Sequence, residues 1–228
     1  PQTVNLRLQG MNKFLEFIKQ DKLKMKFVKV QQKNFLENVI SNEDYKFLKT
    51  RLKNDGYEEW YFVVWFMTAT GARVSELLQI KAEHITAGHL DIYTKGGKIR
   101  RLYIPQILKN EAVVWLRSKG ISSGYIFLNR FGKRITTRGI AQQLKHFADK
   151  YGLKREVVYP HSFRHRFAKN FLDRFNDIAL LADLMGHESI ETTRIYLRRT
   201  ATEQRAIVDK VVCLLYTSPS PRDSTSSR

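Results

Sequence analysis

The first residues of the chain alternate between apolar and polar positions with helical spacing. Apolar side chains recur every three or four residues from Val4 to Ile18, which predicts an amphipathic helix over about residues 1–20. A single helix cannot bury such a face by itself, so we expect its packing partners to lie outside this sequence. Residues 21–34 are rich in Lys and Gln and weakly periodic. We interpret them as a basic linker, either solvated or following a phosphate backbone.

From Phe35 onward the pattern becomes that of a globular domain dominated by helices. Residues 58–70 contain a long apolar run and are followed by Gly71, which predicts a buried helix. Two β-like segments at 90–94 and 100–104 are separated by a glycine turn, which predicts a hairpin. Further helices are predicted after the N-cap signal of Ser41 and over about residues 72–80 (with Arg73 in the first turn), 105–119, 137–151, 162–174, 177–185, 189–198 and 202–214, with a short irregular pair at 127–135. The expected fold class is therefore α+β, a mainly α-helical domain with a small antiparallel β-sheet.

The last residues of the chain differ in composition from the rest. Residues 213–228 turn abruptly to Ser, Thr and Pro, which cannot build a packed core. We interpret them as a disordered tail of non-native, adapter-like sequence. The globular domain is then expected to span residues 35–212.

The charge balance indicates a polyanionic partner. The 228 residues include 40 Lys and Arg against 22 Asp and Glu, a formal net charge of +18. A globular chain this basic usually binds nucleic acid. The longest apolar run, Trp60 to Ala69, is about half of the ~20 residues that a membrane span requires. Cys213 is the single cysteine, so no internal disulfide can form, and we expect a cytoplasmic protein in a reducing compartment.

The sequence lacks the usual signatures of metal-dependent or nucleotide-dependent catalysis. It contains no H-E-x-x-H motif, no cysteine pair and no G-x-x-x-x-G-K-[ST] loop. His161 and His165 are four residues apart and share a helix face, but no third ligand is near them in the sequence. We therefore expect neither a metal nor a cofactor.

A set of cationic side chains and one tyrosine remains as the candidate chemistry. The set is Arg73, Lys95, His161, Arg164, His187 and Tyr196. Taken singly, each has an ordinary interpretation, such as a surface ion pair with Glu76, a solvated lysine, a helix-end histidine or a packed tyrosine. Together they supply what metal-free phosphodiester cleavage needs. Arginine guanidinium groups stabilise the negative charge of the pentacoordinate transition state through paired hydrogen bonds. A lysine protonates the leaving oxygen, and a tyrosine acts as covalent nucleophile.

The motifs that carry these residues resemble those of the phage integrase family, the tyrosine recombinases, from about Phe35 to Val212. T-G-A-R-V-S-E-L-L resembles the first arginine box of the family, and T-K-G-G-K-I-R-R-L-Y-I-P resembles its β-hairpin. H-S-F-R-H resembles the H-x-x-R box, and L-M-G-H resembles the L-G-H turn. Tyr196 follows His187 by nine residues, where the nucleophile of the family stands.

The resemblance implies an enzyme that cuts and rejoins DNA through a 3′-phosphotyrosyl intermediate, without metal or ATP. Tyr196 would attack the scissile phosphate. The implied roles of the others are phosphate binding for Arg73, Arg164 and His187, general acid for Lys95, proton transfer at the tyrosine for His161, and support for Glu76 and His165. The residues expected to contact DNA are Lys98, Arg100, Arg101, Arg138, Arg166 and Arg194.

The resemblance also implies the architecture and partners of the complete enzyme. Residues 1–20 would be the last helix of a helical, SAM-like core-binding domain. The enzyme would act as a homotetramer on double-stranded DNA, with possible accessory DNA-bending or directionality factors, in the nucleoid of a prokaryote or on a phage or mobile element. Two alternatives are a type IB topoisomerase, which relaxes DNA as a monomer, and a non-catalytic DNA-binding module. The short hairpin and the L-M-G-H turn favour the recombinase.

Overall fold

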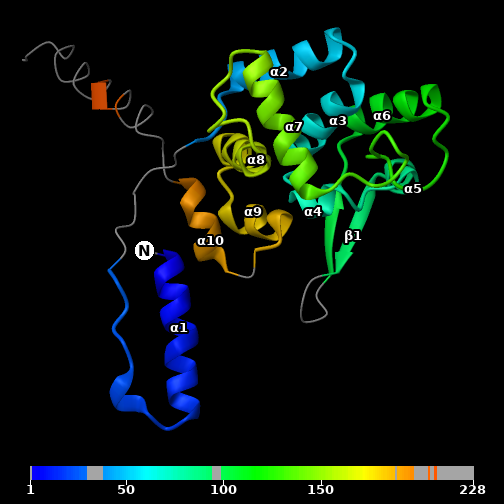
Figure 1. Ribbon diagram of the computed structural model, residues 1–228. Coiled ribbons are helices and arrows are strands. Elements are labelled where there is room, and N and C mark those ends of the chain that lie inside the picture. The colour runs from blue at the N-terminus through cyan, green and yellow to red at the C-terminus, as the bar shows by residue number, and fades with distance from the viewer. Residues whose placement is uncertain are drawn as a thin grey trace, which may run out of the picture. The chain divides into compact units, whose positions relative to one another are not determined.

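The computed structural model describes residues 2–29, 38–93, 99–187 and 189–197, together with 205, 208 and 209. The chain divides into two compact units, Pro1–Asn34 and Phe35–Arg228. We call them the N-terminal unit and the C-terminal unit, and each is described by itself (Figure 1).

The N-terminal unit is a helix with an extended segment folded back along it. Helix α1, Gln2–Phe17, is followed by a 3₁₀ turn, η1, Asp21–Leu23. The side-chain amides of Asn5 and Asn12 each make two hydrogen bonds of 2.8–2.9 Å to one residue of the returning chain, Val28 and Met25 respectively. Seven helical residues and three extended residues both cover about 10 Å, so the two pairings stay in register.

Residues 24–29 are therefore tied to α1 and are not a free linker, which modifies the prediction for 21–34. The sequence concealed this contact because asparagine is ordinarily a solvated residue on a helix surface. Several apolar side chains of the unit remain exposed, among them Leu6, Phe14 and Phe17. An exposed apolar face of this kind is the one that the helical periodicity predicted.

The C-terminal unit is mainly helical, as predicted. Its elements are α2 (Asn42–Asn54), α3 (Glu58–Thr70), α4 (Val74–Leu77), α5 (Ala82–Ala87), β1 (His89–Tyr93), β2 (Ile99–Tyr103), α6 (Gln106–Ser118), α7 (Thr137–Lys150), α8 (Pro160–Phe175), α9 (Ile178–Met185), α10 (Ile190–Arg194) and η2 (Ile195–Leu197). Figure 1 shows α8 in the middle of the unit, with α7 and α9 beside it. In the described part of the chain, no helix is long and apolar enough to cross a membrane.

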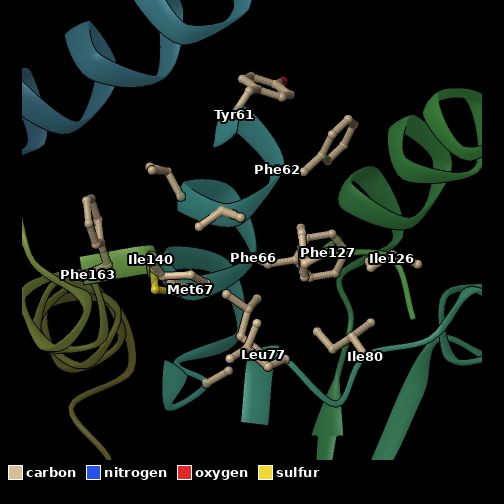
Figure 2. Packing of buried hydrophobic residues seen from close by; sticks show 14 of the residues in the cluster. Tyr61, Phe62, Phe66, Met67, Leu77, Ile80, Ile126, Phe127, Ile140 and Phe163 are labelled. Carbon is tan, nitrogen blue, oxygen red and sulfur yellow. The ribbon is translucent and has the colours of Figure 1, made fainter. Parts of the chain in front are cut away.

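Helix α3 forms the centre of the core. It is apolar on all faces, which is the pattern of a helix covered on every side, and it packs against α2, α6 and α8. Phe66 is fully buried and meets Phe127 edge to face, with ring centroids 5.9 Å apart (Figure 2). The helix ends at Gly71, whose φ of 63° lies in the left-handed region that favours glycine.

The β-hairpin was predicted within one residue at each end. Strands β1 and β2 pair antiparallel, with Leu90 opposite Leu102 and Ile92 opposite Arg100. Successive side chains of a strand point to opposite faces, so Arg100 shares the buried face with Leu102, whereas Arg101 is exposed. The predicted turn, including Lys95 and Lys98, lies outside the described residues.

The predicted helix over 72–80 is shorter than expected. Helix α4 spans Val74–Leu77, and Arg73 is its N-cap residue rather than a member of its first turn. The chain is extended again by Lys81, which forms an isolated β-bridge with Tyr125. The N-cap role of Ser41 is confirmed, because its hydroxyl accepts a hydrogen bond from the backbone N–H of Asp44. The predicted helix at 202–214 and the tail at 213–228 lie almost wholly outside the described residues.

Candidate active site

Three separate segments of the chain bring three arginines around one glutamate. Glu76 of α4 is buried and accepts hydrogen bonds from the backbone N–H of Arg73 at 2.7 Å and from its Nη1 at 2.8 Å. Nη1 of Arg100, from β2, donates to the same carboxylate at 2.8 Å. Nη1 of Arg164, from α8, lies 3.9 Å from it. Burial alone raises the pKa of Glu76, but Arg100 and Arg73 outweigh burial, so the pKa lies below its ordinary value and the carboxylate stays ionised.

Arg100 is part of this cluster, which the sequence did not predict. It was expected to contact DNA, and in the structure it is 7% exposed. Its Nε donates to the carbonyl of Leu184 at 2.8 Å, so β2 is fastened to the end of α9. Gly186 permits this approach, since a Cβ there would lie 2.3 Å from Cδ of Arg100. The inward face of β2 turns the side chain toward Glu76, and the contact of Arg100 with DNA stays a prediction.

Arg164 is held from two sides of the site. Its Nη1 donates to the carbonyl of Gly71, and its Nη2 donates to the carbonyl of Met185 at 2.7 Å. Nη2 also lies 3.1 Å from Nε2 of His187. Burial, together with Arg73 and Arg100, lowers the pKa of Arg164 to about 10, so the guanidinium remains charged at neutral pH. The side chain is 2% exposed and its orientation is fixed.

His187 lies in the turn after α9, at the left-handed Gly186 that ends this helix, as predicted. Its Nδ1 is 2.7 Å from the hydroxyl of Thr193 on α10. Burial and the nearby Arg164 lower the pKa of His187 to about 4, so the ring is neutral at physiological pH. Thr193 is fully buried and was not singled out from the sequence.

Tyr196 sits in η2 beside these groups. It is 6% exposed, and its ring is nearly parallel to that of His187 with centroids 6.2 Å apart. The ring of His165 lies 5.3 Å away. Burial raises the pKa of Tyr196, while the positive charges of Arg164 and Arg73 and a hydrogen bond from Arg164 oppose that rise. The tyrosine is therefore protonated at rest, in a position where cations favour its phenolate.

The two histidines of α8 differ in exposure. His161, near the start of the helix, is exposed, and burial of part of its ring together with Arg164 lowers its pKa. His165 is more enclosed; burial and His161 lower its pKa to about 4, and its buried Nδ1 has no hydrogen-bond partner among the described residues. The two rings lie 6.0 Å apart. Both are neutral at pH 7, so each offers a free ring nitrogen as a proton acceptor.

The opposite side of α8 fixes the helix in the domain. The hydroxyl of Ser162 accepts a hydrogen bond of 2.8 Å from the backbone N–H of Ile40, and the guanidinium of Arg166 donates to the carbonyl of the same residue. Phe163 is fully buried in the main core, and Phe167 packs on Gly71, where a Cβ would lie 2.4 Å from its Cδ1. Arg166 was expected to contact DNA; in the structure it is buried, and that contact stays a prediction.

The remaining predicted DNA contacts lie on the surface. Arg101, Arg138 and Arg194 are exposed. Arg101 makes a bidentate ion pair with Asp91, and Arg194 pairs with Glu191. Lys95 and Lys98 are outside the described residues, so the structure does not place the predicted general acid.

Residues 120–124, G-I-S-S-G, match the G-x-S-x-G spacing of hydrolase nucleophile elbows. That motif functions where a strand turns sharply into a helix. Here it lies in the loop after α6, and Ser122 is exposed. The serine therefore lacks the setting that would activate it. Among the described residues there is also no group of three or more His, Cys, Asp or Glu able to hold a metal ion.

The chemistry available at this site is anion binding beside a nucleophile. Three guanidinium groups face one carboxylate, which leaves an excess of positive charge held by rigid contacts. Arg73 is the most accessible of the three and reaches solvent. A phosphate oxygen placed there meets fixed donors, which is the arrangement that stabilises developing negative charge.

Comparison with known proteins agrees with this picture. The model of the phage integrase family matches residues 36–203. Tyrosine recombinase XerA of Pyrococcus furiosus is 31% identical over 216 residues, covering 91% of this chain and 73% of that protein. Tyrosine recombinase XerC of Pseudomonas entomophila is 32% identical over 149 residues, covering 62% of this chain and 48% of that protein. The chain thus spans about half to three quarters of the length of these relatives.

Solved structures show the same fold. The crystal structure of XerA recombinase superposes with a TM-score of 0.65 at 19% identity, covering 96% of this chain and 77% of that one. The Tn1549 transposon integrase, in complex with circular intermediate DNA, gives 0.68 at 15% identity, covering 92% and 80%. The fold is therefore that of a tyrosine recombinase catalytic domain. The chain belongs to the phage integrase family.

Proposed function

We propose that the C-terminal unit is the catalytic domain of a site-specific recombinase that cuts and rejoins double-stranded DNA through a 3′-phosphotyrosyl intermediate. The observation that carries this proposal is the position of Tyr196, buried against Arg164 and His187 at the edge of the arginine cluster. In the family that the motifs resemble, a tyrosine at this place is the nucleophile. Its ring here already lies beside the groups that would hold the attacked phosphate.

In the proposed reaction the phenolic oxygen of Tyr196 attacks phosphorus, and the bond to the 5′ oxygen of the next nucleotide breaks. Arg73 and Arg164 hold the non-bridging oxygens, and their charge lowers the energy of the pentacoordinate transition state. The tyrosine proton passes to a neutral histidine, for which His161 is the accessible candidate. Lys95 protonates the leaving 5′ oxygen.

Glu76 and Arg100 act by positioning in this proposal. The carboxylate orients Arg73 and Arg100 through fixed hydrogen bonds. His165 supports the tyrosine through ring packing. Arg101, Arg138, Arg194 and Lys98 remain candidates for contacts with the DNA backbone.

The relatives also support the wider setting of the proposal. XerA and XerC are named tyrosine recombinases, and the Tn1549 transposon integrase was solved in complex with circular intermediate DNA. These relatives favour strand exchange over the relaxation catalysed by a type IB topoisomerase. We further propose a homotetramer on DNA, helped by accessory DNA-bending or directionality factors, in the cytoplasm at the nucleoid, with residues 1–20 belonging to the core-binding domain.

The test is formation of a covalent complex on nicked duplex DNA whose sequence has been selected by binding from a random pool. The unsubstituted chain should form a protein–DNA band that survives denaturation, and Tyr196→Phe should abolish it while leaving DNA binding intact. Covalent product from the Phe variant contradicts the assignment of the nucleophile. Relaxation of plasmids that lack the selected site, without strand exchange, supports the topoisomerase instead.

A further inference from the structure

A buried threonine hydroxyl contacts the histidine of the phosphate site. Oγ1 of Thr193 lies 2.7 Å from Nδ1 of His187, and Thr193 is fully buried. Thr193 is on α10, three residues before Tyr196. The contact therefore joins His187 to the segment that carries the candidate nucleophile.

The hydrogen bonds of the free protein define the tautomer of His187. Arginine has N–H donors and no acceptor, so Nε2 of His187 must accept the bond from Nη2 of Arg164, which is 3.1 Å away. A neutral imidazole carries one proton, and that proton must then sit on Nδ1. Thr193 Oγ1 accepts it.

A phosphate in the site requires the other tautomer. The non-bridging oxygens of a phosphodiester only accept hydrogen bonds. When Nε2 of His187 faces such an oxygen, His187 can bind it only by donating from Nε2. The proton then leaves Nδ1 to water and another arrives at Nε2, with no change in charge. Nδ1 becomes an acceptor inside the protein and needs a donor.

We propose that Thr193 is a positioning residue whose hydroxyl sets the tautomer of His187, accepting from Nδ1–H in the free protein and donating to Nδ1 when phosphate is bound. A hydroxyl is suited to this because it serves as donor and as acceptor by rotation about one bond. Valine has the same shape as threonine but can neither donate nor accept a hydrogen bond, whereas serine can do both. The inference rests on the proposed phosphate-binding role of His187.

The tautomer can be observed directly by ¹⁵N NMR of the imidazole in the full chain. In the DNA-free protein, the unsubstituted chain, Thr193→Val and Thr193→Ser should all show the Nδ1–H form, since Arg164 still donates to Nε2. The second measurement uses the selected duplex in a Tyr196→Phe background, which holds the complex before cleavage. There the Nε2–H form should appear with Thr or Ser at 193, and Val should fail to complete the change.

Cleavage kinetics give the second readout. At metal sites, loss of the partner that orients a ligating histidine costs about 10- to 100-fold in metal affinity or activity. By analogy, Thr193→Val should slow covalent-complex formation about 10- to 100-fold with unchanged DNA affinity. Thr193→Ser should restore the rate. Thermal melting checks that the variants are folded; if Val unfolds the protein, the comparison of Thr193→Ser with Thr193→Ala isolates the hydroxyl.

The outcomes separate this inference from the proposed function. The role of Thr193 is overturned if DNA binding causes no tautomer change with threonine at position 193. It is also overturned if Thr193→Val cleaves as fast as Thr193→Ser. If the unsubstituted chain forms no covalent product, the proposed function fails. The NMR measurement on the bound duplex still decides whether Thr193 switches the histidine.

Discussion

Glu76 is the carboxylate at the centre of the arginine cluster, and its neutralisation gives a sharp test of how the site is held together. Glu76→Gln keeps the shape of the side chain and one carbonyl oxygen, but it removes the counter-charge of Arg73 and Arg100. Breaking a buried ion pair by removing one partner costs roughly 3–5 kcal/mol. Since glutamine still accepts a hydrogen bond, we expect a loss near the lower end, about 3 kcal/mol.

The assay is reversible unfolding by urea or heat, followed by circular dichroism. For a chain of 150–250 residues, 1 kcal/mol corresponds to about 2–4 °C in Tm, so a decrease of roughly 6–12 °C is expected. Sulfate should reduce the difference, because the variant site has more uncompensated positive charge and binds the anion more tightly. Glu76→Ala, which also removes volume, should lose more than Gln and serves as the control for packing.

The dependence on pH has a defined sign. The pKa of Glu76 is lowered in the folded state, so its stabilising contribution is complete above its unfolded pKa and disappears as the pH falls through the folded value. The stability difference between the unsubstituted chain and Glu76→Gln should therefore shrink below about pH 4.5. A Tm change under about 2 °C at neutral pH, or a difference that persists in acid, refutes the view that this carboxylate holds the cluster together.

Three further predictions concern other parts of the site. Gly186→Ala should lower covalent-complex formation and Tm, because the glycine has a φ of 60° and a Cβ would displace Arg100; an unchanged cleavage rate would show that the position of Arg100 is unimportant. The pKa of His187 is lowered to about 4, so its NMR signals should stay those of a neutral ring from pH 8 to about pH 5. The free energy of unfolding should decrease as the pH falls from about 6.5 to 4, because in this range only the unfolded chain takes up a proton on this histidine. Ser162→Ala should cost about 1–3 kcal/mol in urea unfolding, since it leaves the buried N–H of Ile40 without its acceptor; Ser162→Thr, which keeps the hydroxyl, is the matched control.

The fold class followed from the sequence because the local signals agreed with one another. The uniformly apolar stretch of α3, the N-cap at Ser41 and the glycine after Thr70 are each decided by neighbours within a few residues. The hairpin strands were found for the same reason. Helix α4 was predicted too long. The chain after it enters a bridge between Lys81 and Tyr125, which are 44 residues apart in the sequence and which no local pattern connects.

The sequence predicted the site residues that lie in known motifs. It did not predict the residues that join the site through contacts between distant segments. Arg73, Arg164, His187 and Tyr196 were all predicted, and the structure brings them together. Arg100 occupies an inward position of β2, and pleat alternation alone predicts its face. Its burial beside Glu76, however, is a tertiary contact that no local pattern reveals.

Two other residues illustrate the same limit. Arg166 looked like a surface cation, and its partner, the carbonyl of Ile40, is 126 residues away in the sequence. Thr193 stands in a polar stretch, T-T-R, where either threonine has the same local appearance. Only the packing of α10 against the turn at His187 distinguishes it.

The hydrogen bonds of Ser162 and Arg166 to Ile40 have a consequence for the position of helix α8. Both polar groups of Ile40 are bound to α8, so the backbone just before α2 is fastened to the helix that carries His161 and Arg164. A partner that displaced the backbone at Ile40 would therefore act on the position of Arg164 without touching the arginine cluster itself.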